Sequence, residues 1–328
     1  MGSRPAPRQL WLDVARGIGI VLVVHGHVVN GLADAGILQG AWVFTTFLVY
    51  CFHMPLFFVA AGITAAHSLN RGARAFLRPR LSTVVYPYFL WSTIQLLTKM
   101  ALPEHVNHPV DWSTVVGIGI WPREQFWFLY ALLICQVISA FVSRALLLPV
   151  AAALYLTSYF LPGGMGITAG AHFAIFFAVG VIFSARFATW NPGWSWFLCW
   201  IPFVVLGTFA WRTDPNYFSY SARAAGAFGI IGTFCVAKRL RDGAANVLAW
   251  LGKASMAIFV LHTFPASGIR IVLVKLGVFN STLHYAAGVT AGLGFSIAAM
   301  MILARWGLLP WLGLAAFKKP AATARATS

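Results

Sequence analysis

Apolar runs of about 20 residues recur along almost the whole chain and are separated by short polar or basic connections. A helix needs about 20 mostly apolar residues to cross the hydrocarbon core of a bilayer. Of the 328 residues, 60% are hydrophobic and only 9% are charged, whereas soluble domains carry about 25% charged residues. The chain is therefore predicted to be an all-α, polytopic integral membrane protein.

The breaks between these runs set the limits of the predicted helices. They predict about ten membrane-spanning helices, at residues 10–32, 42–66, 82–102, 125–143, 146–161, 168–187, 194–211, 219–237, 250–275 and 282–304. Pro265 is expected to kink the ninth span, because proline removes a backbone donor from a helix. One transmembrane domain is expected over residues 1–318, followed by a disordered cytoplasmic tail over 319–328.

Lysine and arginine gather in every second connection. If there are ten spans, one side of the membrane receives both termini and the basic residues Arg4, Arg8, Arg71, Arg74, Arg78, Arg80, Arg144, Arg186, Lys238, Arg239, Arg241, Arg305, Lys318, Lys319 and Arg325. Basic connections stay on the cytoplasmic side, so both termini are predicted to be cytoplasmic. The net charge of +16 then reflects anchoring and attraction to anionic membrane lipids or an anionic ligand, and nucleic acid is not expected as a partner.

The first apolar run carries four residues that are costly at bilayer depth, namely Asp13, Arg16, His25 and His27. At about 100° and ~1.5 Å per residue, Arg16 and His27 share one helix face and lie roughly 16 Å apart along the axis. Asp13 falls on that face, and His25 points away from it. These groups could simply satisfy one another as buried structural residues, but three ionisable groups on one face favour a functional site.

Further polar residues could belong to the same site. His53 lies just before Pro55, and it could either serve a site or satisfy carbonyls that the proline frees. Trp127 opens the fourth span, where interfacial aromatic residues are common, and His262 lies within the ninth span. His172 is expected to cap a span end or to reach the interface. No histidine or cysteine spacing typical of metal sites occurs, so no metal is expected.

Four arginines follow the second span within ten residues, at Arg71, Arg74, Arg78 and Arg80. The planar guanidinium can bind phosphate oxygens through two parallel hydrogen bonds, so this segment could form a phosphate pocket. Ordinary cytoplasmic anchoring explains the same arginines without any ligand. The residues alone leave both interpretations open.

The motifs in these segments resemble those of the membrane-bound acyltransferase type 3 family, in the branch of fucose 4-O-acetylases and polysaccharide O-acetyltransferases. In the first span the matching residues are Asp13, Arg16, Gly17, Ile18, Ile20, Val23, Gly26 and His27. Further matches are Phe52 to Phe58 with Gly62, Pro87 to Trp91, Trp127 to Leu129, and Leu251 to His262. The resemblance covers residues 10–262 in patches and is weak over 145–245. The chain departs from the family pattern at His25, usually apolar, and at Ala60 and Ala61.

The resemblance implies an O-acyltransferase of the bacterial inner membrane that moves an acetyl group from acetyl-CoA to a hydroxyl of a cell-surface sugar or polysaccharide. The catalytic residues would be His27, as general base, and Asp13, which pairs with Arg16 or the basic segment rather than contacting His27. The residues expected to bind acetyl-CoA are Arg16, Arg74, Arg78, Arg80, Tyr88 and Lys253. The site is also expected to include His53, Trp127 and His262.

Two other functions fit the same residues. The acceptor could be a cytoplasmic small molecule, because donor binding would then be identical. A transporter or flippase of glycan precursors could also use the polar face of the first span as its pathway. The chain lacks a visible paired repeat and has few acidic residues for ion coupling, which counts against transport.

Overall fold

A computed structural model describes residues 9–161 and 166–314. In this part of the chain the secondary structure is helical throughout, without strands. Seven helical stretches there are long and apolar enough to cross a membrane, judged by length and composition. The predicted all-α, polytopic architecture is thus confirmed, whereas the number of ten spans and the cytoplasmic termini stay predictions. The predicted disordered tail over 319–328 lies outside the described residues.

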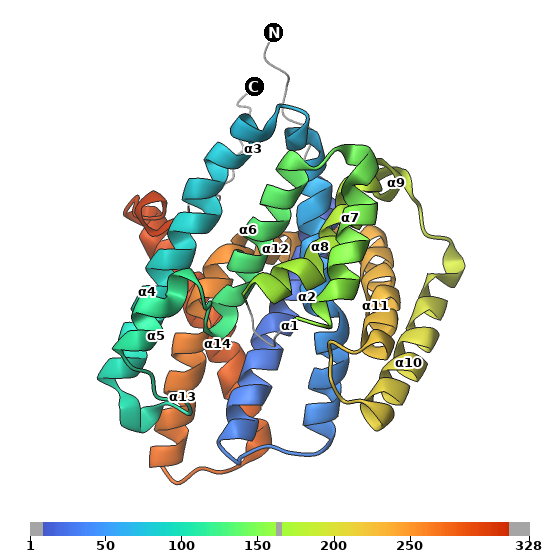
Figure 1. Cartoon of the computed structure of the whole chain (residues 1–328). Helices are drawn as coiled ribbons and strands as arrows, with labels where there is room; N and C mark the ends of the chain where they lie inside the picture. Colours follow the sequence, from blue (N-terminus) through green and yellow to red (C-terminus); the bar gives the residue numbers. More distant parts are fainter. Residues whose placement is uncertain (1–8, 162–165, 315–328) are drawn as a thin grey trace, which may run out of the picture.

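Most of the longer helices run along the bundle from one end to the other (Figure 1). Their bounds are α1 Leu10–Asp34, α2 Ala41–Leu69, α3 Ala73–Arg80, α4 Tyr86–Ala101, α5 Trp112–Val116, α6 Trp127–Phe141, α7 Arg144–Ser158, α8 Ile167–Ile182, α9 Ser184–Thr189, α10 Trp200–Thr213, α11 Tyr220–Arg239, α12 Asp242–Leu261, α13 Thr263–Lys275 and α14 Ser281–Arg305. A π-helical turn at Leu81–Val85 joins α3 to α4.

The ninth predicted span differs from the structure in its start and in the place of its break. Helix α12 begins at Asp242, and the chain leaves the helix at His262, before α13 begins at Thr263. Pro265 was expected to be the kink itself, but a proline lacks the N–H that would bond to the carbonyl four residues earlier. The helix therefore ends in the turn before Pro265, which puts His262 at the break.

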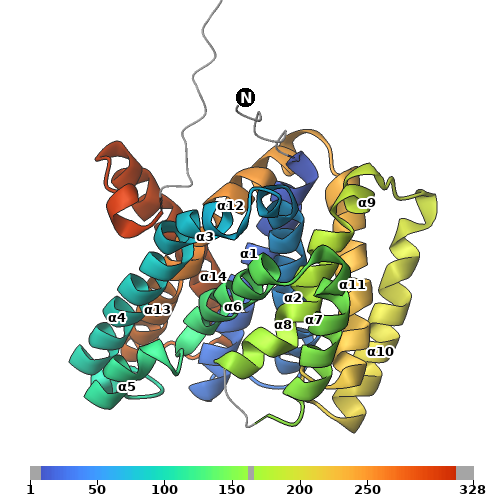
Figure 2. The ribbon, with the colours of Figure 1, turned by 45° about the horizontal axis from the view of Figure 1, so that its top comes forward.

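Helix α1 is the central element of the bundle and contacts α2, α11, α12, α13 and α14. Helices α10 and α11 lie on one side of α1 and α2, and α4, α13 and α14 lie on the other (Figure 2). The approach of α1 to α12 depends on two glycines. A Cβ atom at Gly17 would lie 1.9 Å from the carbonyl oxygen of Leu248, and one at Gly252 would lie 1.9 Å from that of Asp13. Both glycines belong to the motifs noted in the sequence.

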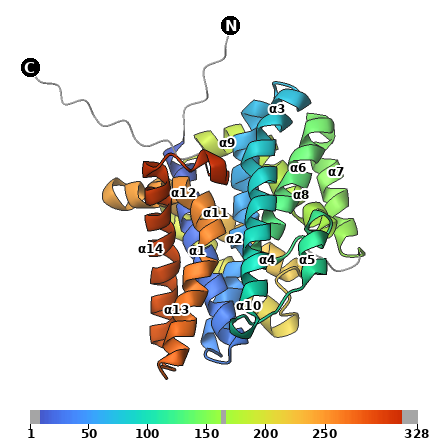
Figure 3. The ribbon, with the colours of Figure 1, turned by 90° about the vertical axis from the view of Figure 1, so that its left-hand side faces the viewer.

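The beginning of α1, the end of α14 and helix α3 lie at one end of the bundle (Figure 3). We call this the basic end, because α3 carries Arg74, Arg78 and Arg80. The connections from α1 to α2 and from α13 to α14 lie at the opposite end (Figures 1 and 3). Helix α1 therefore carries Arg16 near the basic end and His27 toward the opposite end, as the helical spacing predicts.

Candidate functional site

Two cavities meet at His27. The first has a volume of about 390 Å³ and lies between α1, α4, α13, α14 and the connection after α4. Its lining includes Asp34 and His108, whose side chains are 48% and 75% exposed, so it reaches the surface opposite the basic end. The second cavity has a volume of about 200 Å³ and lies between α1, α2, α6, α8 and α11. His27 lines both cavities.

The imidazole of His27 makes no hydrogen bond to any residue that the structure describes. Its ring packs against that of His262, with the ring centroids 5.1 Å apart. His25, two residues earlier, is instead bonded on both sides. Its Nδ1 lies 3.0 Å from the hydroxyl of Tyr285, and its Nε2 lies 3.3 Å from that of Thr46. His25 is therefore a structural residue, and His27 is the histidine of α1 that is available to a ligand.

His53 and His262 are held in the same way. His53 donates its Nδ1 proton to the carbonyl of Val49 at 2.9 Å, and His262 donates to the carbonyl of Ile258 at 2.9 Å. In each ring Nε2 is then left as an acceptor. The Nε2 of His262 is buried and has no hydrogen-bond partner among the described residues.

His53 and Trp127 line the second cavity together with His27. Since the ring of His262 packs on that of His27, the structure brings His53, Trp127 and His262 together around His27. The described residues nevertheless contain no group of three or more histidine, cysteine or acidic side chains placed to hold a metal ion.

Arg223 on α11 is a residue of the second cavity that was not predicted. Its side chain is only 5% exposed, and its Nε donates to Nε2 of His172 at 3.1 Å. Nη1 donates to the carbonyl of Cys51 at 3.0 Å, the carbonyl that Pro55 leaves without its helical donor. The sequence could have indicated this residue, because an arginine inside the apolar span 219–237 has the same free-energy cost at bilayer depth as Arg16 in the first span.

The prediction that His172 caps a span end or reaches the interface is wrong. Its side chain is 4% exposed and lies one turn inside α8. Since Nε2 accepts from Arg223, Nδ1 carries the proton and donates to the hydroxyl of Ser158 at 3.2 Å. The sequence shows how far a residue lies along a helix, but not that this face of α8 turns toward α11.

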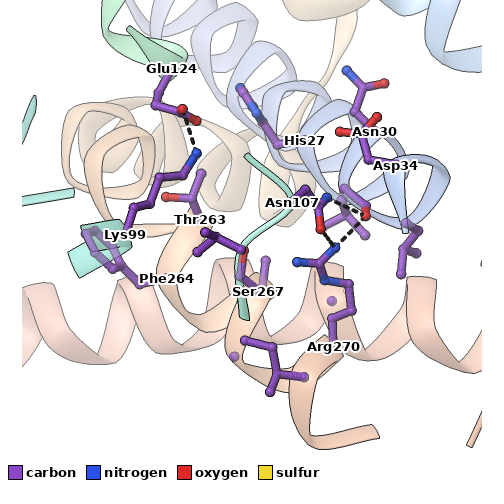
Figure 4. A pocket seen from close by; sticks show the side chains of 18 of the residues that line it. His27, Asn30, Asp34, Lys99, Asn107, Glu124, Thr263, Phe264, Ser267 and Arg270 are labelled. Atoms are coloured by element: carbon purple, nitrogen blue, oxygen red, sulfur yellow. Dashed lines mark hydrogen bonds and ion pairs between the residues drawn. The ribbon is translucent and has the colours of Figure 1, made fainter. Parts of the chain in front are cut away.

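Polar side chains that the sequence did not single out line the first cavity. Gln125 donates to Gln95 at 2.7 Å, Gln95 donates back at 3.1 Å, and the hydroxyl of Thr263 donates to Gln95 at 3.2 Å. Figure 4 shows Lys99 reaching Glu124, at 2.6 Å. Glu124 has a φ of 53°, a left-handed conformation that is costly outside glycine.

The predicted pairing of Asp13 with Arg16 is present at the basic end. Nη1 of Arg16 lies 3.7 Å from Oδ1 of Asp13, and Nη2 donates to the carbonyl of Ala60 at 3.2 Å and to the hydroxyl of Thr64. Asp13 is only 2% exposed. Within the described structure neither residue lines the two cavities, so Asp13 reaches α2 through Arg16 and does not reach His27.

The other residues expected to bind the donor also lie outside both cavities in the described structure. Arg74, Arg78 and Lys253 are exposed. Arg80 is half-buried, lies 4.4 Å from the ring centre of Phe76 and donates to the hydroxyl of Ser68 at 3.4 Å. Tyr88 is 3% exposed and donates its hydroxyl to the carbonyl of Ile118, so its polar atom is already bonded.

The fold and the site define a polytopic helical membrane protein with a cluster of histidines where two cavities meet. Residues 9–304 match a family model described as an acyltransferase domain. The chain therefore belongs to the membrane-bound acyltransferase type 3 family, as the motifs in its first two spans indicate.

Two curated relatives are similar to parts of the chain. The nodulation protein NolL of Mesorhizobium japonicum is 27% identical over 215 residues, which is 62% of this chain and 56% of that protein. NolL of Sinorhizobium fredii is 29% identical over 133 residues, 38% of this chain and 34% of that protein. The matched part of the chain thus spans about half or less of these relatives. No solved structure matches the chain.

Proposed function

We propose that this protein is an integral membrane O-acyltransferase of a bacterial inner membrane. It moves an acetyl or other short acyl group from acetyl-CoA to a hydroxyl of a cell-surface sugar or polysaccharide. The observation that carries the proposal is His27, an imidazole with no hydrogen bond to the described residues that faces both cavities. Membership of an acyltransferase family supplies the class of reaction.

In this proposal His27 acts as the general base. A sugar hydroxyl is a weak nucleophile, and a positioned base typically accelerates such a reaction by about 10²–10⁴-fold. The neutral imidazole takes the hydroxyl proton while the oxygen attacks the thioester carbonyl. The carbon–sulfur bond then breaks, and the proton passes to the departing sulfur, which leaves an O-acyl ester and free CoA thiol. His262, whose ring packs on His27, holds the imidazole in place.

The donor is proposed to arrive from the basic end. Arg74 and Arg78 are exposed there, and Arg80 lies beside them on α3, so their guanidinium groups suit the phosphates of CoA. Lys253 adds a further exposed positive charge on α12. Arg16, tied to Asp13, lies between this end and His27. The roughly 16 Å from Arg16 to His27 along α1 is about the length that an extended pantetheine arm has to cover.

The acceptor is proposed to arrive through the first cavity, from the end opposite the donor. Asn30, Gln95, Gln125 and Arg270 line this cavity. Their amide and guanidinium groups suit the donors and acceptors of sugar hydroxyls. If the termini are cytoplasmic, this cavity faces the outer side of the membrane, where a surface glycan is assembled.

The test compares two histidines on the same helix. Surface glycans would be analysed by mass spectrometry from cells that make the wild-type protein, His27→Ala or His25→Asn at equal protein levels. We expect the wild type and His25→Asn to add the mass of an acetyl group, and His27→Ala to add none. Near-wild-type transfer by His27→Ala at an unchanged protein level would overturn the proposal.

A binding experiment separates acyl transfer from transport. We expect acetyl-CoA to raise the melting temperature of the purified protein, since a ligand that binds the folded state stabilises it. A protein that only moves glycan precursors across the membrane has no site for acetyl-CoA. Its melting temperature would not change.

A further inference from the structure

Arg223 in the second cavity has a positive charge that the proposed transfer does not use. Two of its three guanidinium nitrogens are fixed by the protein, Nε on His172 and Nη1 on the carbonyl of Cys51. His172 is itself fixed by Ser158. Nη2 makes no hydrogen bond to a described residue, and Arg223 lines the cavity. The guanidinium is thus held rigidly, with one nitrogen left for a ligand.

No carboxylate forms an ion pair with this arginine in the part of the chain that the structure describes. The rings of Phe173 and Phe218 lie 5.2 and 4.9 Å from its central carbon and stabilise the cation without neutralising it. Glu124 lines the same cavity, but it is paired with Lys99 at 2.6 Å. A buried charge without a counter-charge is costly, so the cavity favours an anion.

Two tyrosine hydroxyls add donors on the same cavity wall. The hydroxyl of Tyr50 accepts from Asn30 at 2.9 Å, so its own proton remains available. The hydroxyl of Tyr217 makes no hydrogen bond to the described residues, and the two tyrosine rings lie 5.5 Å apart. Both tyrosines line the cavity, as does His27.

We propose that the second cavity is a subsite for a carboxylate group, bound by Arg223 together with Tyr50 and Tyr217. One guanidinium charge matches one carboxylate, whereas a phosphate monoester carries about −1.5 to −2 at neutral pH and would leave negative charge unpaired. The second cavity shares His27 with the first, so the carboxylate belongs to a molecule that reacts there. In this respect the inference rests on the proposed acyl transfer.

The carboxylate can be part of either substrate. It can belong to the acceptor, as in a sugar acid, or to the acyl group, as in the half-thioester of a dicarboxylic acid. In both cases Arg223 is a specificity-determining residue that selects an acidic substrate over a neutral one of the same shape. The volume of about 200 Å³ limits the bound group to a small one.

The first arm of the test measures binding alone, by calorimetry on the purified full chain. We expect methyl glucuronide to bind at least about tenfold more tightly than methyl glucoside, or succinate more tightly than neutral succinamide, because the hydrogen bond to a charged carboxylate is lost in each neutral ligand. Arg223→Lys keeps the charge but loses the planar fork, and Tyr217→Phe loses only a hydroxyl. Each is expected to weaken the acidic ligand about tenfold and to leave the control ligand unchanged.

Two matched variants control for general damage. Arg144→Lys alters an arginine that donates to the carbonyl of Val181, and Tyr285→Phe removes the hydroxyl that bonds His25. Neither residue lines the two cavities in the described structure, so neither change should alter the affinity for the acidic ligand.

The second arm measures acyl transfer with acetyl-CoA or succinyl-CoA and with a neutral or an acidic sugar. A preference for the acidic sugar places the carboxylate on the acceptor, and a preference for succinyl-CoA places it on the donor; either supports the inference. Arg223-dependent binding without any acyl transfer also supports the subsite, while counting against the proposed function. Equal affinity for acidic and control ligands, or affinity unchanged in both Arg223→Lys and Tyr217→Phe, would overturn it.

Discussion

The contact between α1 and α12 sets the position of His27, and adding a single Cβ atom at Gly17 would disturb this contact. In Gly17→Ala the new Cβ would lie 1.9 Å from the carbonyl oxygen of Leu248, whereas real Cβ atoms essentially never approach closer than 3.0 Å. The obstacle is backbone, which cannot rotate away as a side chain can. The helices must therefore part by about 1 Å or more at this point.

Two consequences follow for Gly17→Ala. Overpacking of this kind typically costs about 1–3 kcal/mol of stability, so we expect a lower melting temperature in detergent. Because α1 carries His27 and α12 ends at His262, the separation also disturbs the packing of the two rings. A misplacement of about 1 Å can cost roughly 10²-fold in rate. We expect a loss of that order in acetyl transfer per folded molecule, measured with labelled acetyl-CoA.

The matched control is Gly294→Ala on α14, where a new Cβ meets no atom within 4 Å. Alanine is favoured over glycine in a helix by roughly 0.5–1 kcal/mol, so this variant should be at least as stable as the wild type. It should also keep full activity. Wild-type stability and activity in Gly17→Ala would refute the reasoning, since the helices would then have room that the structure does not give them. Lower stability with unchanged activity would refute only the claim that the contact between α1 and α12 positions His27.

Three further changes test other parts of the site. His25→Asn should lower the melting temperature, because the hydroxyl of Tyr285 loses its partner at a typical cost of about 1 kcal/mol, but it should keep transfer activity; inactive but stable protein would contradict this. Gln125→Leu leaves the buried amide nitrogen of Gln95 without its acceptor and should cost about 1–3 kcal/mol in chemical unfolding; an unchanged midpoint would show that the amide pair is dispensable. Glu124→Gln removes the counter-charge of Lys99 in the first cavity and should raise the KM of the acceptor more than it lowers kcat; an effect on kcat alone would place Glu124 in the chemical step instead.

The helical architecture and the face of α1 were predictable because they depend on local regularities. Apolar length indicates a membrane helix, and the spacing of Arg16 and His27 follows from the helical repeat. The same helical repeat predicts that His25 points away from the face of His27. The structure shows what lies on that other side, since His25 bonds to Tyr285 and Thr46 there. Helix ends were less predictable, since Pro265 indicates a break without fixing the residue of the preceding turn at which α12 ends.

The walls of the cavities were not predictable in the same way. Gln95, Gln125 and Thr263 come from three different elements, and only their packing brings them into one network. No single span shows an unusual pattern at these positions. Tyr88 illustrates the opposite case: it lies in a family-like motif, yet its hydroxyl is bonded to the backbone of Ile118, and it lines neither cavity in the described structure.

Pro55 in the second span connects a feature that the sequence shows with a contact that only the fold shows. Pro55 is visible in the sequence and leaves the carbonyl of Cys51 without a helical donor. A free carbonyl inside a membrane protein requires a partner, and two candidates were open, His53 nearby or a group from elsewhere. His53 donates to the carbonyl of Val49 instead, and Arg223 of α11 donates to the carbonyl of Cys51. The arginine inside an apolar span and the carbonyl left unbonded by Pro55 are each noticeable in the sequence, and in the fold they bond to one another. This bond and the one to His172 fix the guanidinium in the second cavity, which His27 also lines.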